Sequence, residues 1–410
     1  MDNKIKLVIC GDLVPTEKSS KLFEDANIDC LIDKNIQSFL HNSDFRFFNL
    51  ETPLCDSKNP IPKSGPNLIA PTKTIKGIKA LNPSLIGLAN NHILDQDEYG
   101  FWQTIKTLEE FDINYTGGGK NQKEAAKPFI YEQNGIKIGI YCCAENEFTN
   151  ATEETCGANP FDFLNSFDDV SELSKKVDHT IVIFHGGREY YRYPSPNLQK
   201  ICRKFCDKGA NVVICQHSHC IGCEENYNSS KIVYGQGNFH FDMQDREEWL
   251  TSLLIQLEIS CDKIDVNYFP ITKNGCKIEA ANTEKEKEIL ENFYKRSKEI
   301  LEANFVKDNY KKEAEKALLS YIRQFYTLNR YAMQNNLNCE AHREVFHYGL
   351  KCCEFDREKI KNILNPIKQT APIKQEKFIE KIFSVKNEKS KNIRRKVITI
   401  LGIKMKFKKG

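Results

Sequence analysis

Two histidines separated by a single residue follow an apolar run near the middle of the chain. The run NVVICQ, residues 211 to 216, ends at His217-Ser218-His219. Side chains two positions apart on a strand point to the same face, so a turn just after a strand can aim both imidazoles at one ion. Two solvated histidines in a loop are the alternative, because short motifs often match by chance. The motif alone leaves both interpretations open.

Four other apolar runs also end in residues that can bind a ligand. KIKLVICGD ends at Asp12, DFRFFNLE at Glu51, SLIGLANNH at Asn91 and His92, and HTIVIFH at His185. Sheets of α/β proteins place ligands just beyond the carboxyl ends of their strands, so these run ends predict one shared site. Asp12 and Asn91 could instead cap helices that begin after their strands.

The residue types suit divalent ions. A mixed set of Asp, Glu, Asn and three His fits Mn²⁺, Fe²⁺ or Zn²⁺, and six ligands are more than one four-coordinate zinc needs. Two ions that share a bridging carboxylate would use the whole set. Such pairs activate water and stabilise an in-line displacement at phosphorus.

The pattern of apolar and charged residues changes along the chain. Up to about residue 275, short apolar runs alternate with amphipathic stretches, the pattern of an α/β domain with buried strands. From residue 283 to about 369, apolar residues recur at helical spacing among dense charges. We therefore predict an α/β domain over 1–275, a helical C-terminal region over 276–383 and a basic amphipathic tail over 384–410.

Composition and charge narrow the class of protein. The chain has 410 residues, 40% of them hydrophobic and 28% charged, and no apolar stretch suits a signal peptide or membrane span, so we expect a cytoplasmic protein. The sixteen cysteines are scattered, which favours reduced thiols. The tail holds ten Lys or Arg and one Glu, a net charge of +9, which leaves −6 for residues 1–383 out of the total of +3. No nucleic-acid partner is expected from a slightly acidic body.

The ordered motifs GD, NLE, NNHILD, HGGREYY, HSH and YGQGNFHFD resemble those of the CapA family of capsule and poly-γ-glutamate synthesis proteins. That family resembles the calcineurin-like metallophosphoesterases, and the similarity covers roughly residues 4 to 270. It implies an α/β fold in the form of a four-layer α/β/β/α sandwich, here with a C-terminal helical appendage. The site would lie at one edge of the two sheets.

The resemblance also implies roles for single residues. His92 would be the acid that protonates a leaving group. The two divalent ions would be held by Asp12, Glu51, Asn91, His185, His217 and His219. Three further residues are candidates from their own type and position, without the resemblance. Asp95, three residues after His92, would orient its ring or be a turn residue; Glu189 would contact substrate or lie in a solvated loop; and Asn238 would be a turn former or support the site.

The chain departs from the family pattern at three points. Cys215-Gln216-His217-Ser218-His219 replaces the usual Gly-His-His-Pro-His run. Gly-Gly follows His185 where the family favours Trp-Gly. Val14 occupies the His position of the Asp-x-His motif that opens most calcineurin-like phosphoesterases, which bears on how fully one metal site is occupied.

The tail NIRRKVITILGIKMKFKK combines apolar residues with cations, a composition suited to an anionic bilayer surface. It resembles the C-terminal tails of some bacterial surface-polysaccharide glycosyltransferases; a disordered solubilising end is the alternative. We expect a CapA-like protein of capsule or surface-polymer biosynthesis at the inner face of the membrane. It would be a metal-dependent hydrolase of a phosphoester or related bond in a cell-envelope polymer or its precursor. A non-catalytic polymer-binding or assembly factor is the alternative, although the Asn91-His92 pair favours catalysis.

Overall fold

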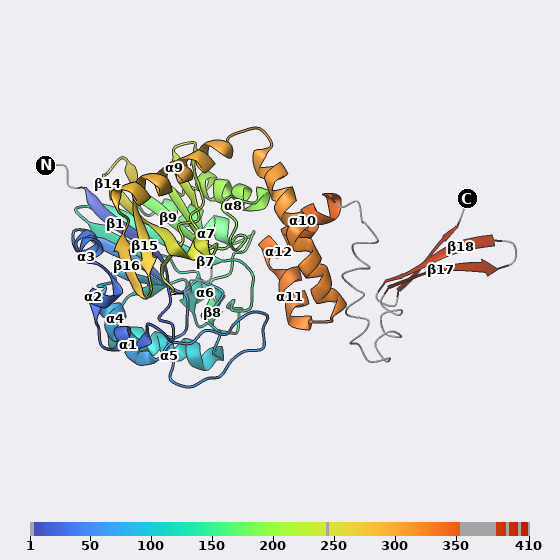
Figure 1. Cartoon of the computed structure of the whole chain (residues 1–410), viewed down its shortest axis with the longest axis horizontal. Coiled ribbons are helices and arrows are strands. Elements are labelled where there is room, and N and C mark those ends of the chain that lie inside the picture. Colours follow the sequence, from blue (N-terminus) through green and yellow to red (C-terminus); the bar gives the residue numbers. More distant parts are fainter. Residues whose placement is uncertain (1–3, 243–245, 353–382, 391–392, 401–402, 409–410) are drawn as a thin grey trace. The chain divides into compact units, whose positions relative to one another are not determined.

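The structure is a computed structural model that describes residues 4–242, 246–352, 383–390, 393–400 and 403–408. It divides into two compact units, Met1–Tyr321 with Asn329–Cys352, and Ile322–Leu328 with Cys353–Gly410. The first unit contains two large sheets and their helices (Figure 1). Residues 353–382 of the predicted helical region lie outside the described residues.

The first sheet has eight strands in the order β16-β15-β14-β1-β2-β3-β4, and β13 pairs with the end of β1. β1 runs parallel to β2 and β13 and antiparallel to β14, so the carboxyl ends of β1, β2 and β3 lie at one edge. The strands are β1 (Ile5–Leu13), β2 (Phe45–Leu50), β3 (Leu85–Gly87), β4 (Tyr115–Thr116), β13 (Asn238–His240), β14 (Thr251–Ile259), β15 (Ile264–Asn274) and β16 (Lys277–Ala280).

The second sheet has six strands in the order β11-β12-β10-β9-β7-β6. Its central strands β7, β9, β10 and β12 are parallel. The strands are β6 (Phe129–Gln133), β7 (Ile136–Ala144), β9 (His179–His185), β10 (Val212–Gln216), β11 (Glu224–Tyr227) and β12 (Ser230–Tyr234). A separate short ladder joins β5 (Gly118–Gly119) to β8 (Gly157–Ala158).

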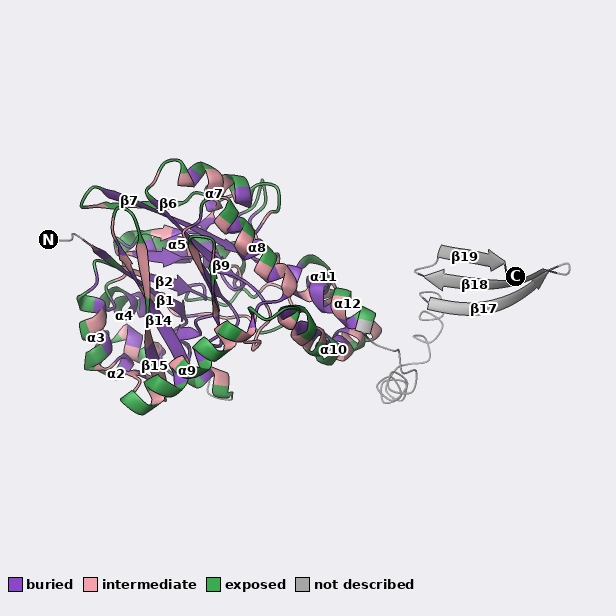
Figure 2. Cartoon of the chain, turned by 90° about the horizontal axis from the view of Figure 1, so that it is seen from above, coloured by how far each residue is buried: buried purple, intermediate pink, exposed green. Residues whose placement is uncertain are grey.

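Central strands of both sheets are buried on both faces, which explains their continuous apolar runs. In β1, Leu7 and Ile9 enter the core between the sheets, whereas Val8 enters the core on the outer face. In β9, Ile183 faces the other sheet and Phe184 faces the outer helices. Figure 2 shows the buried strands between more exposed helices. The predicted four-layer α/β/β/α arrangement is therefore confirmed.

Helices cover the outer faces of both sheets. α8 shows why they form: Ser195 caps its first turn by accepting a hydrogen bond from the amide of Leu198, Pro196 begins it, and its buried side chains recur at helical spacing. The elements of these layers and their connections are α1 (Ser20–Glu24), α2 (Ile28–Leu31), α3 (Lys34–His41), η1 (Thr72–Thr74), α4 (Ile75–Ala80), α5 (Asp97–Glu110), α6 (Gln122–Ala125), α7 (Ser166–Ser174), α8 (Pro196–Asp207) and η2 (Glu247–Leu250).

The predicted helical appendage consists of α9 (Thr283–Glu299), α10 (Phe305–Tyr326), α11 (Arg330–Asn338) and α12 (Glu340–Cys352). Phe293 of α9 joins the core between the sheets. α12 docks on the start of α8, where the Glu344 carboxylate accepts hydrogen bonds from the Ser195 hydroxyl and from the Asn197 amide at 2.8 Å. None of the helices in the described ranges has an apolar stretch long enough to cross a bilayer.

In the second unit, the segment predicted as a basic tail forms a sheet of three antiparallel strands. They are β17 (Phe383–Ser390), β18 (Ile393–Ile400) and β19 (Ile403–Lys408). Alternation of apolar and basic residues in IKMKFK, residues 403 to 408, is typical of a strand.

His240, at the end of β13, makes the fold sensitive to acid. It is buried, and its Nε2 lies 2.9 Å from the carbonyl oxygen of Cys276. Burial lowers its pKa from 6.5 to about 4. Because the unfolded chain binds the proton more readily, this contribution to stability is complete above pH 6.5. It is lost as the pH falls, by about 3 kcal/mol at pH 4.

We therefore expect His240→Gln, whose amide can still donate to the Cys276 carbonyl, to lose less stability than the parent between pH 7 and pH 4. Urea unfolding at several pH values would measure this difference. Parallel pH dependences of the two proteins would contradict the role given to His240.

Candidate metal centre

The structure brings the six predicted ligands together at the edge where the two sheets meet. Asp12 lies near the end of β1, Glu51 follows β2, and Asn91 lies in the turn after β3. From the second sheet, His185 ends β9, and His217 and His219 follow β10. All six are buried, with Asn91 the most exposed at 8%.

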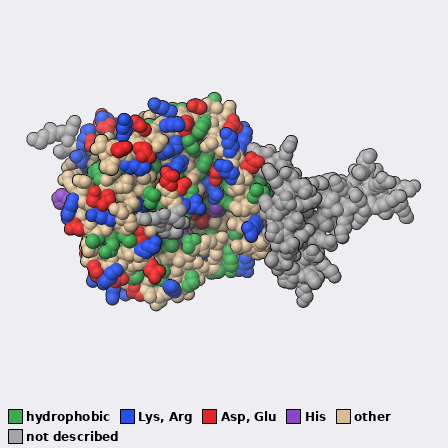
Figure 3. Space-filling view, in the orientation of Figure 1, with side chains coloured by type: hydrophobic (Ala, Val, Ile, Leu, Met, Phe, Trp, Pro, Cys, Tyr) green, Lys and Arg blue, Asp and Glu red, His purple; other side chains and the backbone are tan. Residues whose placement is uncertain are grey.

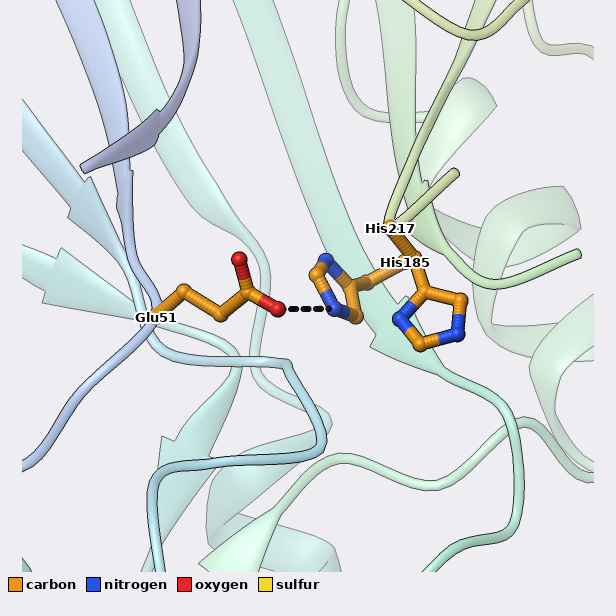
Figure 4. Close-up of side chains that lie close together, drawn as sticks. All are labelled: Glu51, His185 and His217. Atoms are coloured by element: carbon orange, nitrogen blue, oxygen red, sulfur yellow. Dashed lines mark ion pairs between the residues drawn. The ribbon is translucent and has the colours of Figure 1, made fainter. Parts of the chain in front are cut away.

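His185 lies at the centre of the group. Its Nε2 is 3.0 Å from Asn91 Oδ1 and 3.4 Å from Glu51 Oε1. Its Nδ1 is 3.1 Å from Asn49 Nδ2. Figure 4 shows Glu51 reaching from the first sheet toward His185 and His217 of the second.

The possible ligand atoms form two overlapping clusters. Those of Glu51, His185 and His217 lie within 4.8 Å of one another, and so do those of Asp12, Glu51 and His219. Glu51 belongs to both clusters and is the residue that they share.

Glu51 lacks the hydrogen bonds that would stabilise its charge. Within the described ranges, both of its carboxylate oxygens are buried and lack a hydrogen bond. Burial, followed by the charge of Asp12, raises the pKa of Glu51 well above its usual range. Burial, followed by His185, lowers the pKa of His217 well below its usual range, so this imidazole is neutral. A buried carboxyl group that lacks hydrogen bonds and lies beside a neutral imidazole fits a divalent cation.

A turn, rather than a strand, directs His217 and His219. β10 ends at Gln216, and both histidines have positive φ angles, 83° and 54°. The two side chains therefore do not share a face by alternation along a strand, as was predicted, although the two rings still reach the site. Their centroids are 5.9 Å apart.

Asn238 and Trp249 hold His219 in place. Asn238 Oδ1 lies 2.8 Å from His219 Nδ1, and the indole of Trp249 stacks on the imidazole at 4.7 Å. β13 brings Asn238 beside Asp12 in the ladder with β1. Asn238 is thus placed to fix the orientation of a metal-binding imidazole.

His92 lies beside a carboxylate and a lysine and is not a member of the ligand clusters. Its Nδ1 donates to Asp95 Oδ2 at 2.5 Å, and Asp95 Oδ1 forms an ion pair with Lys63. Burial, followed by the charge of Lys63, lowers the pKa of His92. Asp95 therefore lies where it can orient the ring and leave Nε2 for chemistry.

Glu189 differs from the other predicted site residues. It is half-buried in the loop after β9. In the part of the chain that the structure describes, it makes no hydrogen bond or ion pair with the ligands.

The sequence did not single out Asn49, Lys63 or Glu147. Asn49 donates to Asp12 Oδ1 at 2.7 Å, and its position in the run end FFNLE was a usable signal. Glu147 Oε1 lies 3.6 Å from His217 Nε2. Glu147 and Lys63 lie in irregular segments, where no periodic pattern marks a buried position.

A polar cavity of about 380 Å³ adjoins Glu147. It lies between loops of the sandwich and α11. Its lining includes Asp97, Asn150, Gln334 and Asn338. The appendage therefore forms one wall of the space beside the metal centre.

Comparisons with known proteins match this chain to capsule synthesis proteins. The family model described as "Bacterial capsule synthesis protein PGA_cap" matches residues 6–243. Capsule biosynthesis protein CapA of Bacillus anthracis is 28% identical over 251 residues, which cover 59% of this chain and 61% of that protein. PGA biosynthesis protein CapA of Bacillus subtilis (strain 168) is 26% identical over 246 residues, 59% of this chain and 64% of that protein. The chain thus spans less than two thirds of either relative.

Among solved structures, one described as a novel phosphatase, from Mycoplasma pneumoniae, aligns with a TM-score of 0.42 and 14% identity. The alignment covers 67% of this chain and 96% of that chain. A likeness at this TM-score carries no argument about the site.

Proposed function

Because this chain belongs to the bacterial capsule synthesis protein family PGA_cap, we propose that it acts in making a capsule or related surface polymer as a dinuclear metal-dependent hydrolase. The bond cleaved would be a phosphoester or a related bond. The observation that carries the proposal is Glu51, whose buried carboxyl group has no hydrogen bond within the described ranges and belongs to two ligand clusters.

The two clusters assign the ligands. One ion would be held by Glu51, His185 and His217, with Asn91 beside them, and the other by Asp12, Glu51 and His219. Divalent ions bound there would supply Lewis-acid stabilisation of the charge that develops in an in-line displacement.

The remaining chemistry falls to His92. With Nδ1 bonded to Asp95, a protonated ring would hold its second proton at Nε2 and transfer it to the leaving oxygen. Asn91, the neighbouring residue in the chain, lies at the ligand cluster, so the backbone keeps the proton donor next to the reacting bond.

The proposed partner is a cell-envelope polymer or its precursor. The cavity beside Glu147 supports this, because amide and carboxylate side chains line it and suit a polar, hydrogen-bonding chain. Acidic and basic side chains are interspersed on the face in Figure 3, whereas a nucleic-acid-binding face is usually rich in basic side chains alone. We therefore do not propose a nucleic acid as a partner.

A non-catalytic role in polymer binding or assembly is the second candidate. The observation that favours it is Val14, which is buried against Phe241 and Trp249 at the position of an expected histidine. An apolar side chain there can be tolerated more readily in a binding protein than in a hydrolase.

Metal analysis of the purified protein, followed by assays of phosphomonoesters and phosphodiesters with added Mn²⁺, would test the proposal. Hydrolysis that depends on bound metal is expected. Bound metal without hydrolysis of any substrate would favour the binding role, and absence of metal binding would refute both the dinuclear centre and the hydrolase.

We also propose that the segment 384–410 binds an anionic membrane surface at the cytoplasmic face. Its ten cations would contribute about 1 kcal/mol each near anionic lipid, and its apolar residues would add burial at the headgroup boundary. The protein should therefore co-sediment with anionic but not neutral vesicles, and salt should weaken the binding without abolishing it.

Deletion of 384–410 should abolish vesicle binding and leave metal content unchanged, because the proposed ligands lie within residues 12–219. Replacing Arg394, Arg395 and Lys396 by Gln should weaken binding to an intermediate degree. Full binding by the truncated protein would refute this role for the tail.

A further inference from the structure

A third group of metal-binding side chains lies where the helical appendage meets the sandwich. Glu147 belongs to the loop after β7, Cys339 lies between α11 and α12, and His342 is in the first turn of α12. One ligand atom of each lies within 4.8 Å of the others. Cys339 and His342 fall outside residues 6–243, which the family model matches.

We propose that Glu147, Cys339 and His342 form a separate site for a divalent ion that accepts a thiolate ligand, such as Zn²⁺, and that this ion fastens α11 and α12 to the sandwich. A sulfur, an imidazole nitrogen and a carboxylate oxygen are the ligand types that zinc prefers. The spacing Cys339-x-x-His342 places two of them on adjoining turns.

The surroundings favour a cation. Glu145 is buried, and its Oε2 lies 3.5 Å from Cys339 Sγ. Within the described residues, neither Glu145 nor Glu147 forms an ion pair with a lysine or arginine; the Nε2 of the neutral His217 lies 3.6 Å from Glu147 Oε1. Nearby cations are already paired, Arg188 with Glu313 and Arg343 with Glu340. Two carboxyl groups therefore lie at the thiol, and in the described part of the chain neither is paired with a lysine or arginine side chain.

Asn335 supplies a further oxygen. It lies one helical turn before Cys339, and its side-chain nitrogen is 3.4 Å from Glu147 Oε2. Its Oδ1 is buried and has no hydrogen-bond partner among the described residues. This amide oxygen is available as a fourth donor.

A hydrogen bond from outside the cluster supports His342 as a ligand. His342 Nδ1 lies 2.5 Å from the hydroxyl oxygen of Tyr321, which accepts a hydrogen bond from Arg188 at 3.3 Å. When Nδ1–H donates to this oxygen, Nε2 keeps its lone pair for a metal. Histidine ligands in proteins are commonly oriented in this way.

The proposal goes beyond hydrolysis and does not depend on it. Because Glu147 also approaches His217, an ion at this site would fix a carboxylate that faces the dinuclear centre. The appendage would then be held against one wall of the cavity beside that centre.

Metal content and the absorption of the cobalt-substituted protein would test the proposal in the full chain. Co²⁺ bound to a thiolate absorbs through sulfur-to-metal charge transfer, whereas the dinuclear centre offers only oxygen and nitrogen ligands. The parent should show this absorption. Cys339→Ser should lose it together with one zinc ion per chain and keep the remaining ions.

Two further variants are controls for misfolding and for cobalt bound by other cysteines. Cys156→Ser, at a buried cysteine outside the cluster, should retain the absorption and the full metal content. His342→Cys replaces one zinc ligand by another and should retain the ion with stronger charge-transfer absorption. Equal metal content and absorption in the parent and in Cys339→Ser would overturn the proposal. In that case a protonated carboxyl group would reduce the negative charge of the cluster in place of a metal ion.

Discussion

Replacing Glu51 by Gln is expected to abolish metal-dependent hydrolysis and to weaken the binding of both ions. Glu51 is the residue common to the two ligand clusters, so one substitution removes a charged ligand from each. Loss of residues that merely support a ligand typically costs 10- to 100-fold, and loss of a shared ligand should exceed about 10²-fold in activity. Metal titration and initial rates at saturating Mn²⁺ would measure both effects.

The same substitution should stabilise the metal-free protein. Burying the Glu51 carboxyl group beside Asp12, with no hydrogen bond among the described residues, costs stability, as its raised pKa shows, and an amide of the same shape lowers that cost. In the parent, metal at 100 times its dissociation constant should add about 2.7 kcal/mol per site, and Glu51→Gln should lose most of this gain. Glu51→Gln should therefore be more stable than the parent in the presence of a chelator and less stable than the parent in the presence of Mn²⁺.

Glu225→Gln provides a matched control. Glu225 is also buried, but it is paired with Arg203, and its side chain lies away from the ligand clusters. Its replacement should lower stability and leave the response to Mn²⁺ intact. A Glu51→Gln protein that bound metal like the parent would remove the basis for the dinuclear centre.

The sequence predicted where these side chains meet because burial and strand direction can be recognised from the pattern of apolar residues. Strands covered on both faces read as continuous apolar runs, and the polar residue that ends a run must lie at the edge of the sheet. Asp12, Glu51 and His185 follow this rule directly. His217 and His219 reach the site through positive φ angles, which no hydrophobic pattern encodes.

Contacts between loops that are distant in the sequence could not be predicted from sequence patterns. Lys63 and Glu147 are carried by irregular segments, and their side chains reach the site because of the path of the chain in space. Helical periodicity predicted the appendage, yet it could not predict that Glu344 would bind the start of α8 or that Cys339 would approach Glu145. Periodicity shows which face of a helix is buried and not what covers that face.

His92→Asn is expected to lower hydrolysis by about 10²-fold or more while the metal content stays at the parent level. The reason is geometric. His92 bonds to Asp95, and neither of them belongs to a ligand cluster, so the variant should lose a proton donor without losing a ligand. Rates and metal content measured on the same preparations would separate these two roles.

Substrates with different leaving groups provide a second, independent test of the role of His92. A nitrophenolate leaves without a proton, whereas an alkoxide needs one, so His92→Asn should slow hydrolysis of alkyl phosphoesters much more than hydrolysis of nitrophenyl esters. Asp95→Asn should show the same preference with a smaller loss, because Asp95 acts by holding the Nδ1 proton of His92. If the hydrolysis rates of both kinds of ester fell equally, His92 would not be the proton donor. If the metal content fell together with the rates, His92 would instead be a ligand.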